Sequence, residues 1–137
     1  MKIIGTGSAH PTCAVTNQML EQFLETTDEW ITERTGIKER CVISSEHLED
    51  MAVHAANKAL EDAGLTAADI DFLICSNVVN EYVTPALSCI IQGKLGAKCP
   101  TVDINAACAG FIYAMDMADD KLKAGKAKNI LIVCAEE

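Results

Sequence analysis

Two stretches of this chain are apolar at nearly every position, and both are too short to be typical helices. They are Phe72–Ser76 and Ile130–Ala135. A strand with apolar side chains on both faces has to be covered on both sides, which is typical of parallel sheets that lie between layers of helices. Because helical patterns occupy the intervening sequence, these stretches predict an α/β fold with a mainly parallel sheet.

The rest of the sequence supplies helices and strands in alternation. We expect helices over 48–63, 86–95 and 108–124, strands over 2–5, 38–43, 72–76, 101–104 and 130–135, and two short helices beginning near Thr16 and Thr27. Glycines follow most of these helices, as is typical of helix ends. No linker or repeat divides the chain, so we expect one domain or part of one. The last strand is followed by no helix that could cover its second face, which indicates a piece of a longer protein.

Charge and the lengths of the apolar runs argue against two classes of function. Twenty acidic and 11 basic residues give a net charge of -9, so the average field of the chain repels nucleic acid. The longest apolar run, Ile130–Ala135, is far shorter than the roughly 20 residues of a membrane span. The first residues also lack the pattern of a signal peptide. We therefore expect a soluble cytoplasmic protein that binds neither nucleic acid nor membranes.

The chain has seven cysteines, an odd number, with no Cys-x-x-Cys pair and no histidine at the spacing of a zinc site. This pattern argues against a disulfide framework and against a structural metal. We expect six of these residues to be buried, reduced thiols that act as small apolar side chains. The six are Cys13, Cys41, Cys75, Cys89, Cys99 and Cys134.

Cys108 has a different setting. It lies in the segment 103–111, Asp-Ile-Asn-Ala-Ala-Cys-Ala-Gly-Phe, where a buried strand ends near Asn105 and a helix begins. A turn here would project the sulfur outward, and the unpaired amides and the dipole of the helix start favour the thiolate. The small neighbours leave room for an acyl group and let the amide of residue 108 face an oxyanion. Such a thiolate could accept an acyl group from a thioester, although a structural cysteine fits the same spacing.

The segment 103–111 closely resembles the active-site segment of the β-ketoacyl-acyl-carrier-protein synthase III family. Three further segments resemble that family in its order and approximate spacing: KIIGTGS at 2–8, TTDEWITERTGIKER at 26–40 and LEDAG at 60–64. The resemblance covers essentially the whole chain and the first part of a family member. It implies a thiolase-like fold in which residues 1–137 form the amino-terminal half-domain of a five-layered α/β/α/β/α enzyme, with the carboxy-terminal half absent.

The resemblance implies an acyltransferase that initiates fatty acid biosynthesis. Cys108 would take a short acyl primer from acyl-CoA, and the enzyme would condense this primer with malonyl-acyl carrier protein to give β-ketoacyl-acyl carrier protein. Coenzyme A thioester is then a substrate, and no cofactor is expected. The family acts as a homodimer and supplies a catalytic His and Asn from its second half, so we expect this chain alone to lack condensing activity.

The resemblance also assigns three residues to the binding of coenzyme A. Trp30 would stack on the adenine, while Arg34 and Thr26 would help to hold the nucleotide. An indole offers a flat apolar face and a guanidinium can pair with phosphate, so the residue types suit this role. From the residues alone, Trp30 could equally belong to the core, and Arg34 could pair in solvent with a neighbouring acidic residue.

Two further features have an alternative explanation. In the family, the loop that corresponds to 80–85 reaches the partner subunit and walls its acyl pocket. Thr84 matches the position in this loop whose bulk helps to set the length of the acyl primer, and a threonine there indicates a roomy pocket. The following Pro85 is also an ordinary residue near a helix start. A group of lysines could form a docking patch for an acidic carrier protein or could simply complement a helix end. The lysines are Lys121, Lys123, Lys126 and Lys128.

Two other functions remain open at this point. Another acyl-CoA condensing enzyme of the thiolase superfamily, such as a polyketide-type ketosynthase or a hydroxymethylglutaryl-CoA synthase, would share the same segments. A truncated, non-catalytic chain that only binds or dimerises would share them as well.

Overall fold

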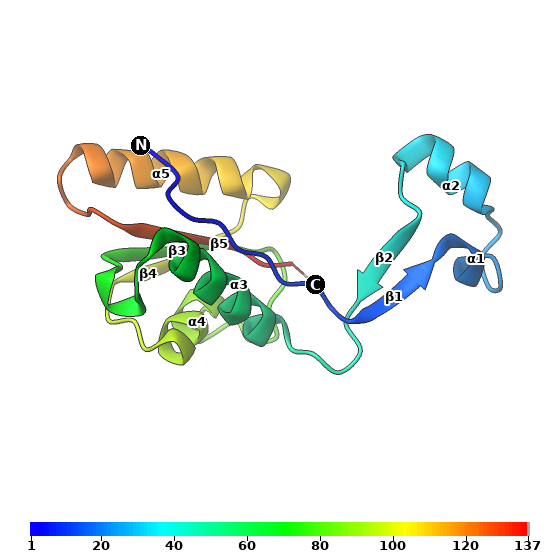
Figure 1. Ribbon diagram of the computed structural model, residues 1–137, viewed down its shortest axis with the longest axis horizontal. Helices are drawn as coiled ribbons and strands as arrows, with labels where there is room; N and C mark the ends of the chain where they lie inside the picture. The colour runs from blue at the N-terminus through cyan, green and yellow to red at the C-terminus, as the bar shows by residue number, and fades with distance from the viewer. Residues whose placement is uncertain (137) are drawn as a thin grey trace. The chain divides into compact units, whose positions relative to one another are not determined.

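The computed structural model describes residues 1–136 and contains two compact units, each of which is treated by itself. The larger unit consists of residues 1–9 together with the chain from His47 onward, and the smaller unit consists of residues 10–46. Figure 1 labels the helices and strands.

A parallel sheet of three strands forms the centre of the larger unit. Its strands are β3 (Phe72–Ser76), β4 (Thr101–Ile104) and β5 (Ile130–Cys134), in the order β4-β3-β5. β3 pairs in parallel with both neighbours, and its Leu73 and Ile74 are completely buried. The prediction of a mainly parallel sheet with strands apolar on both faces is therefore confirmed.

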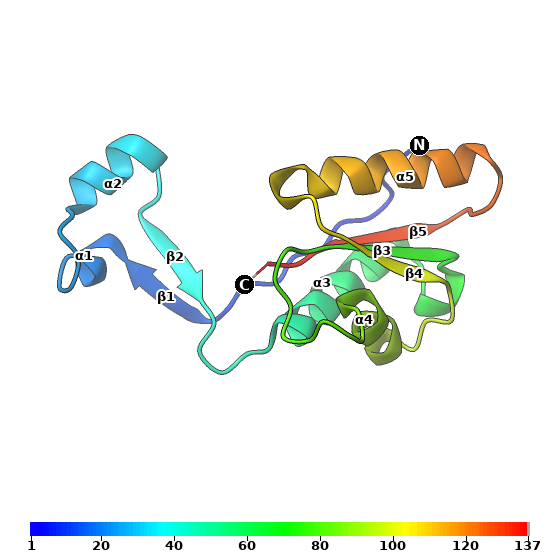
Figure 2. The ribbon, with the colours of Figure 1, turned by 180° about the vertical axis from the view of Figure 1, so that it is seen from behind.

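Helices cover both faces of this sheet (Figure 1), and the view from behind shows the same layers (Figure 2). α5 (Gly110–Lys123) lies on one face, while α3 (Leu48–Ala63) and α4 (Leu87–Leu95) lie on the other. A short 3₁₀ helix, η1 (Ala67–Asp69), precedes β3. The buried side chains of α3 and α5 are mainly alanine and leucine, and small side chains let helices pack close to a sheet.

A polar network holds the smaller unit together. The unit contains β1 (Cys13–Thr16), α1 (Asn17–Leu20), α2 (Asp28–Thr35) and β2 (Glu39–Val42), and the two strands are antiparallel. Asn17 is completely buried. Its side-chain amide donates to Asp28 Oδ1 at 2.7 Å and to the Ile37 carbonyl oxygen at 2.8 Å. Arg40 donates to the side-chain oxygen of Asn17, so each polar atom of this buried amide has a partner.

Most of the expected elements are confirmed. α3, β3 and β4 have the predicted bounds, while α4 begins one residue and α5 two residues later than expected. The strand expected at 2–5 is wrong, because residues 1–11 form no strand. A strand requires ladder hydrogen bonds with a neighbour, and this segment instead lies along α3. There the amide of Thr6 donates to the Asp62 carboxylate at 2.9 Å.

Two glycines allow the amino-terminal segment to lie against α3. A Cβ at Gly5 would overlap the carbonyl oxygen of Ala59, and a Cβ at Gly7 would overlap that of Ala55. Backbone meets backbone here, so any side chain would have to push the segment away from the helix.

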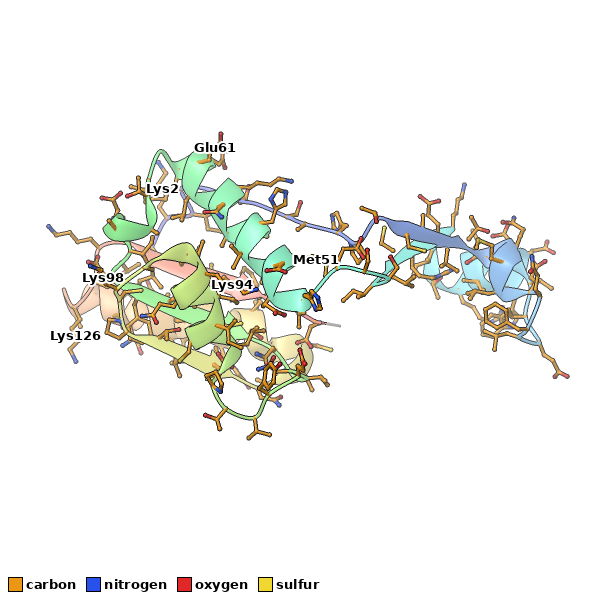
Figure 3. All side chains as sticks on the ribbon, turned by 90° about the horizontal axis from the view of Figure 1, so that it is seen from below. Lys2, Met51, Glu61, Lys94, Lys98 and Lys126 are labelled. Atoms are coloured by element: carbon orange, nitrogen blue, oxygen red, sulfur yellow. The ribbon has the colours of Figure 1, made fainter. Side chains whose placement is uncertain are left out.

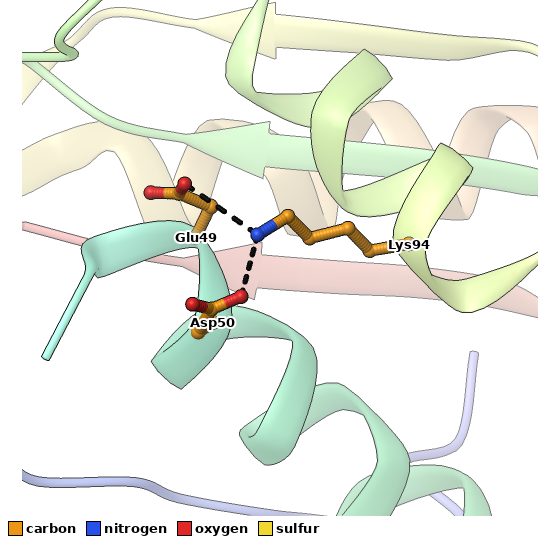
Figure 4. Close-up of polar contacts among 3 residues, drawn as sticks. All are labelled: Glu49, Asp50 and Lys94. Atoms are coloured by element: carbon orange, nitrogen blue, oxygen red, sulfur yellow. Dashed lines mark hydrogen bonds and ion pairs between the residues drawn. The ribbon is translucent and has the colours of Figure 1, made fainter.

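An ion cluster links α3 with α4 on the surface of the larger unit. Lys94 of α4 pairs with both Glu49 and Asp50 in the first turn of α3 (Figure 4). The hydrogen bond from Lys94 lowers the pKa of Asp50 below its ordinary value. Because these groups are solvent-exposed, the cluster contributes little to stability. Among the described residues, no helix has the length and apolar character needed to cross a bilayer.

The contact at Gly7 leads to a stability prediction. We expect Gly7→Ala to lower the free energy of unfolding by about 1 to 3 kcal/mol, because the new methyl group overpacks against the α3 backbone. The matched control is Gly93→Ala on α4, where a Cβ would meet nothing within 4 Å. This control should raise the free energy of unfolding by about 0.5 to 1 kcal/mol through helix propensity. Urea unfolding measures the free energy of unfolding of both variants. Equal changes in Gly7→Ala and Gly93→Ala would contradict the close approach of the amino-terminal segment to α3.

Candidate active site

Cys108 lies between the end of β4 and the start of α5. It is the middle residue of a single 3₁₀ turn, η2 (Ala107–Ala109), in which the amide of Ala109 donates to the Ala106 carbonyl oxygen at 3.0 Å. Cys108 is exposed. The structure therefore has this thiol at an accessible strand-to-helix turn, as the sequence predicts, although α5 itself begins two residues later.

The backbone next to the thiol is strained. Ala107 has a φ of 45°, and it is the only non-glycine residue with a positive φ within residues 1–136. The left-handed conformation costs an L-residue roughly 1 to 2 kcal/mol. Strain of this kind persists only where surrounding contacts enforce it, and it is concentrated at functional sites.

A contact between Gly110 and Ser76 provides that enforcement. Ser76 is the last residue of β3, and Gly110 is the first residue of α5. Gly110 is buried, and a Cβ there would overlap Ser76 Oγ and lie 3.1 Å from Ser76 Cβ. The amide of Asn77 also donates to the Ile104 carbonyl oxygen at 3.2 Å. The position of the Cys108 turn is thus fixed directly by the carboxyl end of the sheet.

Asp103 anchors the start of α4 to β4. Its Oδ2 accepts the amide hydrogen of Leu87 at 2.8 Å, and its Oδ1 accepts that of Ser88 at 2.8 Å. A carboxylate at the amino end of a helix is favourable, because it meets unpaired amides and the positive end of the dipole. The residue at the N-cap position, Ala86, makes no side-chain cap. Sequence reasoning assigns Asp103 no role, although a helix start without a capping residue is a signal that a cap comes from elsewhere.

The other cysteines are only partly as expected. All seven are free; Cys75 and Cys99 are buried and Cys13 is half-buried. The expectation of burial is wrong for the exposed Cys41, Cys89 and Cys134. Strands and helices turn only some of their residues inward, and these three side chains belong to the outward positions.

Three of these thiols are poor nucleophiles near neutral pH. Burial, together with the nearby Asp103 carboxylate, raises the pKa of Cys75 to about 12. Burial also raises the pKa of Cys99, and partial burial with the nearby Glu136 raises that of Cys134. A thiol has to be ionised to attack a thioester, so none of the three competes well for an acyl group.

The three residues predicted to bind coenzyme A lie together in the smaller unit. Trp30 and Arg34 are on α2, and Thr26 comes just before it. Trp30 is 52% exposed, and the guanidinium carbon of Arg34 lies 4.3 Å from the centroid of the indole ring. Trp30 is therefore not a core residue of this unit. The hydroxyl of Thr26 is buried and has no hydrogen-bond partner within the described chain. Whether the three bind coenzyme A stays a prediction.

Thr84 lies in the loop 78–86, which joins β3 to α4. It is exposed, and the peptide bond that links it to Pro85 is cis. Figure 2 shows this loop and the start of α5 at the same end of the sheet. The loop also exposes apolar side chains, with Val79 59% and Val83 102% exposed. The predicted role of Thr84 in the acyl pocket stays a prediction.

The lysine group lies at the other end of the sheet. Lys128 lies two residues before the start of β5, and Lys98 lies three residues before the start of β4, so both are at the amino ends of parallel strands. Figure 3 labels Lys98 and Lys126 toward the same end of the larger unit. Cys108 follows the carboxyl end of β4, and strands of four to five residues separate the two ends by roughly 15 Å. This separation argues against the group as a docking patch beside the thiol, and its position in and after the last turn of α5 suits a helix end.

No group of three His, Cys, Asp or Glu side chains in residues 1–136 could hold a metal ion. The turn between β4 and α5 offers a different kind of chemistry, that of an accessible thiol among small side chains.

Known proteins match this chain over almost its whole length. The family model for 3-oxoacyl-[acyl-carrier-protein (ACP)] synthase III matches residues 102–137. The β-ketoacyl-[acyl-carrier-protein] synthase III of Clostridium perfringens (strain SM101) is 49% identical over 136 residues, which cover 98% of this chain and 42% of that protein. The corresponding protein of Aquifex aeolicus is 46% identical over 137 residues, which cover 99% of this chain and 44% of that protein.

Solved structures agree with the sequence comparison. The crystal structure of 3-oxoacyl-[acyl-carrier-protein] synthase III from Aquifex aeolicus has a TM-score of 0.96 at 46% identity, covering 98% of this chain and 44% of that one. The priming β-ketosynthase from the R1128 polyketide biosynthetic pathway has a TM-score of 0.94 at 37% identity, covering 98% of this chain and 41% of that one. This chain thus spans less than half the length of the relatives that it matches.

These likenesses and the parallel sheet show that the chain has a thiolase-like α/β fold. Within that fold class, the chain is similar to the amino-terminal part of β-ketoacyl-acyl-carrier-protein synthase III proteins.

The Gly110 contact leads to a prediction about the turn. We expect Gly110→Ala to lower the free energy of unfolding by about 2 to 3 kcal/mol, because its methyl group would overlap Ser76 Oγ. Adding Ser76→Ala removes that oxygen and should restore at least half of the loss. Urea unfolding of the two single variants and the double variant gives the coupling energy. Purely additive losses would show that the two residues do not press on one another.

Proposed function

We propose that the protein carrying this sequence is an acyltransferase that initiates fatty acid biosynthesis. The thiolate of Cys108 attacks the carbonyl carbon of a short acyl-CoA, the bond between that carbon and the sulfur of coenzyme A breaks, and coenzyme A leaves. Malonyl-acyl carrier protein then loses carbon dioxide, and the resulting carbanion attacks the acyl-cysteine thioester. The products are β-ketoacyl-acyl carrier protein and the free Cys108 thiolate.

The observation that carries this proposal is the exposed thiol of Cys108 at the turn between β4 and α5. Alanine and glycine surround it in the sequence, so an acyl group meets few side chains near the sulfur. Backbone amides in such a turn can stabilise the oxyanion that forms during thioester attack. The reactive group and the space that it needs are thus supplied by one short segment.

The proposal includes a nucleotide site in the smaller unit. Trp30 offers an exposed indole for stacking on adenine, and Arg34 offers a cation for the phosphates. Thr26, whose hydroxyl group is buried, lies just before the amino end of the same helix and completes the proposed site. The guanidinium already lies against the indole ring, so stacking and charge are available in one place.

The proposal also includes a homodimer in the cytoplasm. The first turn of α5 exposes three large apolar side chains, Phe111, Ile112 and Tyr113, and the loop 78–86 exposes further ones. Exposed apolar groups that follow one another in this way are typical of surfaces that other protein chains cover. Free cysteines suit a reducing compartment.

A second candidate function is the priming step of polyketide biosynthesis. The structural likeness to the priming β-ketosynthase of the R1128 pathway supports it, with a TM-score of 0.94. Both functions begin with acylation of the same cysteine, and they differ in the acyl primer and in the carrier protein that is extended. Comparing the rates with carrier proteins of the two pathways separates them.

Acyl transfer to Cys108 is the direct test of the proposed function. We expect the complete protein to become labelled when it is mixed with [14C]acetyl-CoA, and we expect Cys108→Ser to remain unlabelled, because a hydroxyl group is a far weaker nucleophile at neutral pH. Cys89→Ser, which changes another exposed cysteine, is the control and should label normally. If the wild type binds acetyl-CoA without becoming labelled, the protein only binds its ligand.

The nucleotide site has a separate test. We expect Trp30→Ala to raise the KM for acyl-CoA by about tenfold, the equivalent of roughly 1.4 kcal/mol, with little change in kcat. Stacking on the adenine is remote from the reacting carbonyl, so it contributes mainly to uniform binding. The control is Phe23→Ala, which removes another exposed aromatic side chain of the smaller unit. An unchanged KM in Trp30→Ala would exclude the indole from the site.

A further inference from the structure

The helix that carries Trp30 and Arg34 has no buried side chain. Every residue of α2, Asp28–Thr35, is exposed or half-buried. Eight residues are too few for a helix to be stable by itself in water, and most helices are fixed by burial of an apolar face. Within the described chain, the position of α2 therefore depends mainly on polar contacts.

Asn17 supplies such contacts at both ends of α2. Its side-chain amide donates to Oδ1 of Asp28, the first residue of α2, at 2.7 Å. The same nitrogen donates to the carbonyl oxygen of Ile37 at 2.8 Å, directly after Gly36, at which the helix ends. A single side chain thus fixes the chain on both sides of the helix.

Arg40 determines which way this amide points. Its guanidinium donates to the side-chain oxygen of Asn17 and, at 3.1 Å, to the carbonyl oxygen of Val15 on β1. Because arginine only donates, the amide oxygen has to face Arg40 and the NH₂ group has to face α2. Asp28 also accepts a hydrogen bond from the Thr32 hydroxyl at 3.3 Å, one turn further along the helix. One buried amide therefore connects α2 with both strands of the hairpin.

Asn17 cannot itself contact a ligand on the indole. Asn17 is completely buried, whereas Trp30 is 52% exposed. Removing the amide would leave the Arg40 guanidinium and the Ile37 carbonyl oxygen each short of a buried partner, which is costly. A shift of α2 would then carry Trp30 and Arg34 with it, because both belong to this helix.

We propose that Asn17 is a positioning residue of the nucleotide site, which fixes α2 on the β1–β2 hairpin so that Trp30 and Arg34 meet the nucleotide of acyl-CoA in one arrangement. This inference rests on the proposed function, because it requires Trp30 and Arg34 to bind coenzyme A. Asn17 acts through Asp28 and Ile37 and takes no part in acyl transfer. Its effect is therefore confined to substrates that carry the nucleotide.

The test measures acyl transfer in the complete protein that carries this sequence, with acetyl-CoA and with acetyl-pantetheine, a thioester that lacks the nucleotide. We expect Asn17→Ala to raise the KM for acetyl-CoA by about tenfold with little change in kcat, because remote binding contacts contribute uniformly. The KM for acetyl-pantetheine should not change. The matched control is Asn57→Ala, which removes an exposed asparagine on α3 and should alter neither KM.

A double variant tests whether the effect passes through the indole. In Trp30→Ala, adding Asn17→Ala should raise the KM for acetyl-CoA by less than about threefold, since the side chain that Asn17 positions is already absent. A full further tenfold rise would show that Asn17 acts independently of Trp30 and would overturn the inference.

Asn17→Asp covers the case in which Asn17→Ala does not fold. It retains the shape of the side chain and its pairing with Arg40, but it brings a carboxylate against that of Asp28. The KM for acetyl-CoA should rise as in Asn17→Ala. Adding Asp28→Asn restores a donor and an acceptor between the two positions and should lower this KM again by about threefold or more. No recovery would overturn the role of this hydrogen bond.

Equal changes for the two thioesters would also overturn the inference. If Asn17→Ala raises both KM values alike, or lowers kcat for both, Asn17 only stabilises the smaller unit and does not position the nucleotide site.

Two further measurements do not depend on catalysis. Hydrogen exchange across α2 should become faster in Asn17→Ala and remain unchanged in Asn57→Ala, and unchanged exchange in Asn17→Ala overturns the positioning role. Calorimetry with coenzyme A separates this inference from the proposed function. A wild type that does not bind coenzyme A overturns the proposed nucleotide site itself, whereas equal affinities of the wild type and Asn17→Ala overturn only the inference.

Discussion

The structure of the larger unit depends on the burial of β3 on both of its faces. Leu73, Ile74 and Cys75 are inaccessible to solvent, and burial of such side chains is the dominant favourable contribution to folding. This burial requires α5 to cover one face of the sheet and α3 and α4 to cover the other. Once these layers are in place, the carboxyl ends of three parallel strands meet at one edge, where parallel α/β proteins usually place their sites.

The turn that carries Cys108 is positioned on this sheet by close contacts between backbone and small side chains. Gly110 lets α5 approach the end of β3 until backbone nearly touches the serine hydroxyl. In the turn between β4 and α5, Ala107 has a positive φ and Cys108 is exposed. The thiol is thus held by the sheet beneath it, while Asp103 holds the adjoining loop from the same strand.

Much of this fold could be predicted because its signals are local. Glycines fixed the ends of α2, α3 and α4, where Gly36, Gly64 and Gly96 adopt positive φ values. The buried strands were recognisable from their apolar residues. The amino-terminal segment has the residues of a strand, but strand formation depends on a neighbouring strand, and the described chain offers it α3 instead. The exposed cysteines were unpredictable for a similar reason, since apolar sequence neighbours do not say which face a side chain occupies.

Some features of the candidate site could be predicted from local sequence, whereas others depend on residues far apart in the chain. The position of Cys108 follows from one segment of nine residues, and its turn could be predicted from the change between strand and helix patterns. The role of Asp103 depends on hydrogen bonds to residues 15 to 26 positions away. No periodic pattern reports such a contact. The resemblance to a family does not reveal this role either. Asp103 lies in the matching segment 103–111, but the segment does not show which residues donate hydrogen bonds to it.

The closeness of α5 to β3 also limits how proteins of this kind can diverge. A larger residue at 110 is tolerable only if residue 76 becomes smaller, so a change at 110 requires a change at 76. Residues 81–85 are exposed, and no comparable contact within the described chain restricts them. Natural variation should therefore be rarer at residues 76 and 110 than at residues 81–85.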